Sequence, residues 1–332
     1  MSTLKKVRKI VTCLLTAMLL AISVLGCQSS SSGGASASGG KILFLMTDTD
    51  DTFRATLSEA VVAAAKSQGI ALDMVETGGD AEFESQQVAN AKASGYTAII
   101  LRACDAATAL QMNGAANGLP IVYINAQPDD AHLEGGKYIF VGSDESEAGQ
   151  YQAEYILKKF GNPKSLDVII FEGEIGHSAQ VARTKAVKTT LKKGGCDANY
   201  VFVDTANWSD TEAKEKFEIF MKTGQNVDVI FCNNDTMALG AVEGLKEFGL
   251  DLSKIPVLGV DATADGCASI LAGEMAFTVL QDAKGQGSAA VSAAAVMGSG
   301  GDLSTVEGAS EDLKYVWVPF APVDISNAAS VN

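Results

Sequence analysis

Beyond about residue 40, short apolar runs alternate with amphipathic stretches of helical length, and this rhythm constrains the fold more than any other feature. Mostly apolar runs are typical of strands covered on both faces, and strands that alternate with helices predict an α/β fold with parallel sheets. In Phe53–Lys66, for example, Phe53, Leu57, Val61 and Ala64 fall on one helical face. The predicted strands are Ile42–Met46, Ala71–Val75, Ala98–Leu101, Ile121–Ile124, Val168–Phe171, Tyr200–Val203, Val227–Phe231, Val257–Val260 and Phe277–Leu280. Right-handed crossovers bring the carboxyl ends of such strands to one edge, where open α/β sheets bind ligands.

The first forty residues have the pattern of an export signal. Four basic residues within positions 5–9 precede the apolar run Ile10–Leu25, and Cys27 follows a small residue. This segment resembles a bacterial lipoprotein lipobox, which implies cleavage before Cys27, acylation of its thiol and an extracytoplasmic, lipid-anchored protein. A transmembrane helix is the alternative, although the run is short for a span of ~20 residues. We therefore expect a signal peptide over residues 1–26 and a flexible Ser/Gly-rich linker over 27–40.

Charge and length limit the function further. The chain carries a formal net charge of −15, and losing the four basic residues of the signal makes it −19. So acidic a protein is not expected to bind nucleic acid, which normally requires a basic face. The remaining ~290 residues indicate two domains. Cys104, Cys196, Cys232 and Cys267 lack metal-site spacing, and we expect all four to be unpaired.

Polar and aromatic side chains follow most of the predicted strands. They include carboxylates, amides, arginines and a tryptophan, without a nucleophile poised for catalysis. Carboxylate, amide and guanidinium groups offer the paired hydrogen bonds that vicinal hydroxyls require, and aromatic faces stack on the C–H face of a sugar ring. A cleft that combines both kinds of group favours recognition of a polyol.

These strand-end segments closely resemble the galactose/glucose-binding periplasmic proteins of bacterial ABC transporters. The resemblance runs from Lys41 nearly to the end, and its segments are 173–177 with 182–184, 203–208, 233–238, 259–262 and 278–283. It implies a periplasmic binding protein type I fold, with two doubly wound parallel-sheet lobes joined by a hinge of three crossings. By analogy the crossings lie near Pro120–Ile121, Leu280–Asp282 and Val318–Pro319. The expected lobes are 41–120 plus 282–317 and 121–281 plus 318–332.

The resemblance also implies a set of ligand-binding residues. Phe53 and Trp208 are expected to sandwich a sugar ring, and Asp51 to accept hydrogen bonds from its hydroxyls. The further hydroxyl contacts are expected from His177, Arg183, Asn234, Asp261 and Gln281, the last of which replaces the family's usual Asn. Asp50 is the expected N-cap of the first helix, which leaves Asp51 to face the ligand, and capping or interaction with the helix dipole is the default role for Asp105, Asp235 and Asp282.

Two departures from the family pattern change the charge of the expected pocket. Arg102 replaces an Asn, and Ala179 replaces an Asp. Both substitutions make the potential more positive, which suits an anionic ligand such as a uronic acid or a sugar phosphate. Alternatively, Arg102 pairs with Asp51 or Asp105 and a neutral hexose binds; the sequence leaves both open. The family's calcium loop is absent after Phe160, so no structural metal and no cofactor are expected.

The function expected from the resemblance is capture of a monosaccharide, a galactose- or glucose-like hexose, for delivery to an ABC permease. The protein is then a monomer, held at the membrane by Cys27 and closing by a hinge motion. A sugar sensor that feeds a chemoreceptor or kinase is an alternative that the sequence does not separate from transport. A glycosidase using Asp51 and Asp261 is disfavoured, because the sites match a binding family.

Overall fold

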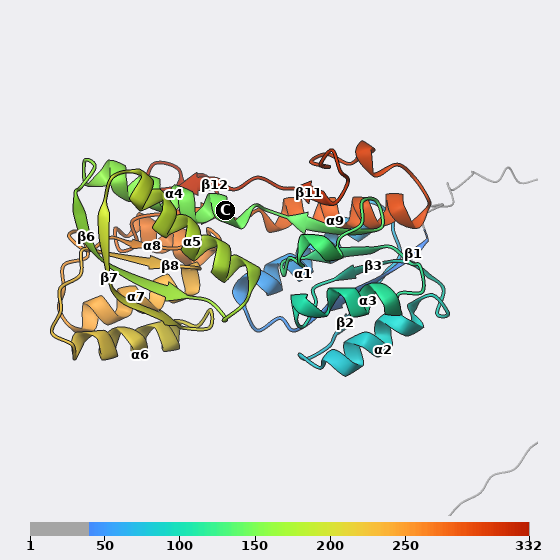
Figure 1. Cartoon of the computed structure of the whole chain (residues 1–332), viewed down its shortest axis with the longest axis horizontal. Helices are drawn as coiled ribbons and strands as arrows, with labels where there is room; N and C mark the ends of the chain where they lie inside the picture. Colours follow the sequence, from blue (N-terminus) through green and yellow to red (C-terminus); the bar gives the residue numbers. More distant parts are fainter. Residues whose placement is uncertain (1–39, 332) are drawn as a thin grey trace, which may run out of the picture. The chain divides into compact units, whose positions relative to one another are not determined.

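The computed structural model describes residues 40–331, which form two parallel sheets, each covered by helices on both faces (Figure 1). The predicted signal peptide, Cys27 and nearly all of the predicted linker lie outside the described residues. Within 40–331, no helix is both long and apolar enough to cross a membrane. The α/β architecture with parallel sheets confirms the fold class predicted from the sequence.

The first sheet has the strand order β11-β5-β4-β3-β1-β2. Its strands alternate between two cores, since Ile42, Phe44 and Met46 face one side and Leu43 and Leu45 face the other. Its strands are β1 (Lys41–Met46), β2 (Leu72–Glu76), β3 (Tyr96–Leu101), β4 (Ile121–Ile124), β5 (Tyr138–Gly142) and β11 (Tyr315–Trp317). Helices α1 (Thr52–Ser67) and α9 (Ala283–Gly298) cover one face, and α2 (Ala81–Ala91) and α3 (Ala109–Ala115) cover the other. We call this sheet and its helices the first lobe.

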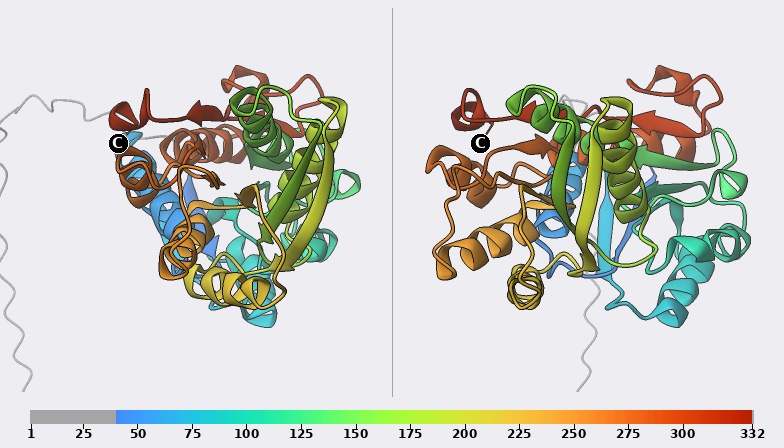
Figure 2. Two further views of the ribbon diagram at one scale, coloured as in Figure 1. Left: turned by 90° about the vertical axis from the view of Figure 1, so that its left-hand side faces the viewer. Right: turned by 60° about the vertical axis from the view of Figure 1, so that its left-hand side comes forward.

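The second sheet has the order β7-β6-β8-β9, and an antiparallel pair, β10 and β12, continues it through a bridge between Leu258 and Phe277. Its strands are β6 (Ser165–Glu172), β7 (Asp197–Thr205), β8 (Val229–Cys232), β9 (Val257–Leu258), β10 (Thr278–Leu280) and β12 (Ala321–Val323). The long parallel pair of β6 and β7 is prominent in Figure 2. Helices α4 (Glu145–Lys159) and α5 (Ser178–Lys193) cover one face, and α6 (Asp210–Met221), α7 (Asp235–Glu247) and α8 (Ala264–Leu271) the other. We call this the second lobe.

The connections between these strands and helices contain short 3₁₀ helices. The 3₁₀ helices are η1 (Ala106–Thr108), η2 (Asp130–His132), η3 (Leu303–Thr305) and η4 (Ala328–Ser330). Cys104 in the first lobe and the buried Cys196 and Cys232 in the second lobe form no disulfide bond.

The expected lobe boundary at Pro120–Ile121 is wrong. The strand β4 that begins at Ile121 pairs with β3, and the unpredicted strand β5 pairs with β4, so both belong to the first sheet. The first passage to the second lobe therefore follows Gly142, between β5 and α4. The second lies between β10 and α9, and the third between β11 and β12, where Figure 1 shows the red C-terminal segment running from one sheet to the other.

The predicted apolar face of the first helix is confirmed, because Phe53, Leu57, Val61 and Ala64 are all buried in α1. Three strands were not predicted. β5 is an apolar run of the same kind as the predicted strands, whereas β11 and β12 are only three residues each and carry no periodic signal.

Close packing between α4 and α5 depends on a glycine. A Cβ on Gly149 of α4 would lie 2.2 Å from the backbone oxygen of Arg183 and 2.9 Å from Cβ of Ala186. Gly149→Ala is expected to destabilise the fold by about 1–3 kcal/mol, because α5 must shift away. The measurement is the midpoint of urea unfolding.

Gly114 of α3 provides the matched control, because a Cβ there would meet nothing within 4 Å. Gly114→Ala is expected to stabilise the chain by up to about 1 kcal/mol through the lower conformational entropy of alanine. An equal effect of the two substitutions would contradict the packing argument.

Candidate functional site

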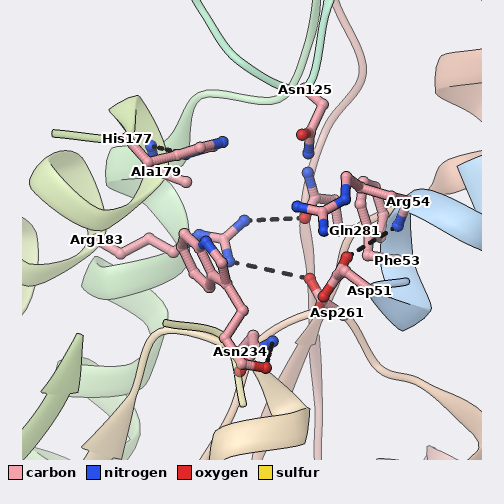
Figure 3. Close-up of a pocket in the computed structure, with 11 residues that line it drawn as sticks. Asp51, Phe53, Arg54, Asn125, His177, Ala179, Arg183, Asn234, Asp261 and Gln281 are labelled. Atoms are coloured by element: carbon pink, nitrogen blue, oxygen red, sulfur yellow. Dashed lines mark hydrogen bonds and ion pairs between the residues drawn. The ribbon is translucent and has the colours of Figure 1, made fainter. Parts of the chain in front are cut away.

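A small cavity of about 30 Å³ lies between the two lobes at the carboxyl ends of their strands (Figure 3). A direct hydrogen bond also links the lobes beside the cavity, from the backbone N–H of Gln127 to Oγ of Ser178, 3.1 Å away. The lining residues are Asp51, Phe53, Arg54, Asn125, His177, Ala179, Arg183, Trp208, Asn234, Asp261 and Gln281.

The structure brings together every residue of the predicted ligand set except one. Arg102 is 3% exposed and lies outside the cavity lining. Its Nε donates to Oδ1 of Asn125 at 3.1 Å, and its Nη1 donates to Oγ1 of Thr47 at 2.9 Å and to the carbonyl oxygen of Ala103 at 3.1 Å. Among residues 40–331 it forms no ion pair, so the expected pairing with Asp51 or Asp105 is not found.

Two lining residues were missed from the sequence. Asn125 follows β4 directly, so the rule of inspecting polar residues after strands would have found it. Arg54 lies in the first turn of α1 beside Phe53, where no local pattern distinguishes a cavity residue from a surface residue.

Three predicted contact residues also cap helices: Asp51, Asn234 and His177, the N-cap of α5. Asp51, and not Asp50, is the N-cap of α1, because its Oδ1 accepts from the backbone N–H of Arg54 at 2.9 Å. Asn234 is the N-cap of α7, with Oδ1 accepting from the N–H of Met237 at 2.9 Å. The Asp51 and Asn234 caps each use one oxygen and fix the side chain's direction, so the other Asp51 oxygen lies at the cavity, and the Asn234 amide nitrogen donates one hydrogen bond to the carbonyl oxygen of Trp208 at 3.4 Å and keeps a second N–H.

Arg183 is held by a dense set of buried partners. Its Nε donates to Oε2 of Glu145 at 2.6 Å, its Nη1 to the carbonyl oxygen of Asn233 at 2.5 Å, and its Nη2 to Oε1 of Gln281 at 2.9 Å. Oδ1 of Asp261 lies 3.9 Å from Nη1 (Figure 3). Burial opposes the charge, but Glu145 and Asp261 outweigh it and raise the pKa of Arg183. The guanidinium is therefore a fixed cation that joins several strand ends.

His177 is a neutral donor at the cavity. Burial, together with Arg102, Arg183 and Arg54, lowers the pKa of His177 to about 3. Its Nδ1 accepts from the backbone N–H of Ala179 at 3.2 Å, so the proton of the neutral ring belongs on Nε2. The imidazole ring meets the Trp208 ring edge-on, with centroids 5.3 Å apart.

The position of Trp208 depends on a nearby glycine and on a strained backbone. A Cβ on Gly173 would lie 2.1 Å from the indole ring, so only glycine leaves room for it. Trp208 has a φ of 66° and Asp261 a φ of 119°, values that are unusual for residues other than glycine. Such strain is concentrated at functional sites, where the surrounding structure imposes it.

Buried carboxylates lie beneath this part of the cavity. Burial raises the pKa of Asp261 well above its usual value, and it raises the pKa of Asp235 to about 7. Asp235 begins α7 without capping it, and as the acidic residue of the first turn it has the helix-dipole role that the sequence also allowed. Its Oδ1 accepts from Oγ1 of Thr278 at 2.5 Å and its Oδ2 from the N–H of Thr263 at 2.8 Å, so it ties β10 and α8 to α7. Asp105 and Asp282 do cap, at η1 and α9.

The raised pKa of Asp235 makes stability depend on pH. Between about pH 4 and pH 7 the folded state keeps a proton that the unfolded state has released, so stability falls as pH rises through this interval. Asp235→Asn is expected to remove part of the slope, at most about 1.4 kcal/mol per pH unit. The measurement is urea unfolding at a series of pH values from 4 to 8.

The exposed Asp251, whose pKa the Ser253 hydroxyl lowers, provides the control. Asp251→Asn should leave the slope above pH 4 unchanged. If Asp235→Asn also left it unchanged, Asp235 would not be the group that titrates.

The cavity offers hydrogen bonds and aromatic faces. Among residues 40–331, no three His, Cys, Asp or Glu side chains are grouped so that they could hold a metal ion. The donors and acceptors come from rigid, mutually bonded side chains, an arrangement that binds a small polar molecule.

Comparison with known proteins agrees with this geometry. Residues 42–302 match the family model described as "Periplasmic binding protein domain". The chain is 31% identical over 284 residues to a putative rhizopine-binding protein of Rhizobium meliloti, covering 84% of this chain and 88% of that protein. It is also 31% identical over 296 residues to the D-galactose/methyl-galactoside binding periplasmic protein of Haemophilus influenzae, covering 84% and 87%.

A solved structure is similar over nearly the same length. It is an ABC transporter solute-binding protein from Bacillus halodurans with bound myo-inositol, with a TM-score of 0.76, 27% identity, and coverage of 87% of this chain and 96% of that one. The chain belongs to the periplasmic binding proteins of type I, the solute-binding proteins of sugar ABC transporters. It is thus an extracytoplasmic binding protein and not an enzyme, as predicted.

Proposed function

We propose that this protein captures a monosaccharide with a galactose- or glucose-like ring and delivers it to the permease of an ABC transporter. The observation that carries the proposal is the joint lining of one cavity by Phe53 and Trp208 together with Asp51 and Asp261. Aromatic faces stack on the C–H faces of a pyranose, and carboxylates accept hydrogen bonds from its hydroxyls. The names of two relatives support this class, since galactose and myo-inositol both present several hydroxyls on a six-membered ring.

Three further lining residues, His177, Asn234 and Arg183, carry N–H groups that can donate hydrogen bonds to hydroxyls. His177 presents Nε2–H and Asn234 its amide nitrogen, while Arg183 is fixed beside Asp261. Asp51, Phe53, Arg54 and Asn125 come from the first lobe, and the second lobe supplies His177, Arg183, Trp208, Asn234 and Asp261, so the ligand completes its contacts only when the lobes close on it. The three chain passages between the sheets form the hinge of this proposed motion.

The chain has two tryptophans, and only Trp208 lines the cavity, which allows a direct test. Galactose or glucose is expected to change the tryptophan fluorescence of the wild-type protein and of Trp317→Phe. The change should disappear in Trp208→Phe, while Trp208→Ala should weaken binding about 10-fold or more through the lost stacking.

The titration panel also contains ribose, galacturonate and glucose 6-phosphate, with isothermal titration as an independent readout. No binding of any of these sugars would contradict the proposed ligand class. An unchanged affinity in Trp208→Ala would contradict the stacking role.

We further propose that Cys27 carries the lipid that holds the protein at the cell membrane, on the strength of the sequence pattern described above. Cys27→Ala is expected to move the protein from the membrane fraction to the soluble fraction. Cys104→Ala, which alters a partly exposed thiol in the first lobe, should leave it in the membrane fraction. The measurement is fractionation followed by immunoblotting, and membrane retention of Cys27→Ala would exclude the anchor.

A further inference from the structure

A second space lies between the lobes beside the cavity, and we call it the outer chamber. It has a volume of about 260 Å³, and it shares the lining residues Asp51, Arg54 and Trp208 with the cavity, so the two spaces are neighbours. The β1–α1 connection of the first lobe forms one of its walls, and the β7–α6 connection of the second lobe forms the other. Its remaining lining residues are Asp50, Thr52, Asn207, Ser209, Asp210 and Thr236.

The volumes of the two spaces indicate that a ligand extends into both. The cavity, at about 30 Å³, holds about one water molecule, so a sugar ring needs space beyond it. Sites for small molecules usually have volumes of ~300–1,000 Å³. The cavity and the outer chamber together come close to the lower end of this range. A ligand that contacts the cavity lining is therefore expected to reach into the outer chamber.

The boundary between the two spaces is divided between the lobes. On the side of the second lobe, the Trp208 ring meets the His177 ring of the same lobe. On the side of the first lobe, Asp51 caps α1 and Arg54 is paired with Asp48. Within 40–331, no hydrogen bond, ion pair or ring contact joins Trp208 to Asp51 or Arg54. A hinge motion of the lobes therefore separates the two sides of this boundary and connects the spaces.

The wall that the second lobe contributes is held in place before any ligand binds. Asn207 and Trp208 have φ values of 47° and 66°, in the left-handed region that is unusual for such residues. The Asn207 side chain accepts from Oγ1 of Thr205 at 3.2 Å and donates to Oε2 of Glu212 at 2.8 Å. Ser209 caps α6. A wall fixed in this way loses little conformational entropy when a ligand contacts it.

Both walls of the outer chamber carry polar groups that the protein itself does not use. The hydroxyl groups of Thr52 and Thr236 and the carboxylate of Asp50 form no hydrogen bond or ion pair with other groups of the described chain. Thr52 and Asp50 belong to the first lobe and Thr236 to the second. A hydroxyl both donates and accepts, and a carboxylate accepts, so together they match a partner that carries several hydroxyls.

The charges of the lining disfavour an anionic group in the outer chamber. Three carboxylates, those of Asp50, Asp51 and Asp210, line it with a single cation. That cation is Arg54, which is already paired with Asp48 at 2.6 Å. A phosphate or carboxylate would be repelled by the carboxylates of the lining, whereas a neutral hydroxylated group would not.

We propose that the ligand is a glycoside, in which one sugar ring lies between Phe53 and Trp208 and a second hydroxylated unit occupies the outer chamber. The second ring of a neutral disaccharide has the required chemistry, because it carries several hydroxyls and no charge. This inference rests on the proposed function and extends its ligand from one ring to two.

Disaccharides compared with the monosaccharides that they contain test the proposal. Isothermal titration of the wild-type protein is run with galactose against lactose and melibiose, and with glucose against cellobiose and maltose, so that both anomeric linkages are represented. At least one disaccharide is expected to bind about 10-fold or more tightly than its monosaccharide, since two further hydrogen bonds give a factor of this size.

Two variants reduce the space of the outer chamber from opposite walls. Thr52→Phe and Thr236→Phe each place a bulky apolar side chain where a free hydroxyl stands, and each should lower the ratio of disaccharide to monosaccharide affinity about 10-fold. Thr56→Phe is the matched control, because Thr56 is an exposed residue one turn along α1 and lines neither space. It should leave the ratio unchanged. Thermal unfolding of each variant verifies that it is folded.

The outcomes separate this inference from the proposed function. Monosaccharides that bind as tightly as every disaccharide would overturn the role of the outer chamber and leave monosaccharide binding in place. A disaccharide preference that survives in both Thr52→Phe and Thr236→Phe would also overturn that role. Binding of disaccharides alone would support the outer chamber and contradict capture of a single ring. Silence across the whole panel would overturn both proposals.

Discussion

The buried guanidinium of Arg183 is the interaction on which the site depends. It joins α5 to Glu145 at the start of α4, to the backbone after β8 and to Gln281 after β10. Leaving a buried charge without a partner costs several kcal/mol, so these groups are forced to meet in one arrangement. The arrangement places strand ends from different parts of the chain at fixed positions around one cavity, which is what a binding site for a small, rigid molecule needs.

Several polar groups of the cavity are oriented by a second hydrogen-bond partner within the protein. The N-terminal ends of α1 and α7 use part of Asp51 and Asn234, the arginines use the oxygens of Asn125 and Gln281, and the Ala179 N–H uses Nδ1 of His177. Each of these second partners decides whether a side chain offers the cavity a donor or an acceptor. The hydrogen bonds that the cavity can offer thus depend partly on residues outside its lining, namely Arg102 and Met237.

Sequence reasoning anticipated the α/β fold and most of the cavity, because both follow from strong local rules. Apolar runs mark buried strands, and parallel connections gather their carboxyl ends, which made Trp208, Asn234 and Asp261 visible as candidates. The same rule would have found Asn125 after β4. It could not find Arg54, since the first turn of a helix gives no signal of what faces it.

Other errors had different causes. The lobe boundary at Pro120 came from analogy, and the pairing of β4 with β3 and β5 overrode it. Arg102 was expected to meet a carboxylate or the ligand, but it meets amide, hydroxyl and carbonyl oxygens. Choices among hydrogen-bond partners of a long side chain depend on tertiary geometry, and a linear sequence contains no measure of it. The prediction that Asp50 caps the first helix was also wrong. Asp51 has two carboxylate oxygens, so it caps the helix and lines the cavity as well.

The hydrogen bond from Gln127 to Ser178 joins the lobes through groups that do not line the cavity. In the hinge motion proposed above, this bond stabilises the closed arrangement whether or not a ligand is present. The apparent dissociation constant of a protein that binds only when closed equals the intrinsic constant divided by the fraction already closed. Affinity therefore depends on the bond between Gln127 and Ser178 as well as on the cavity lining. Weakening this bond would change the affinities for all ligands by the same factor and leave their order unchanged.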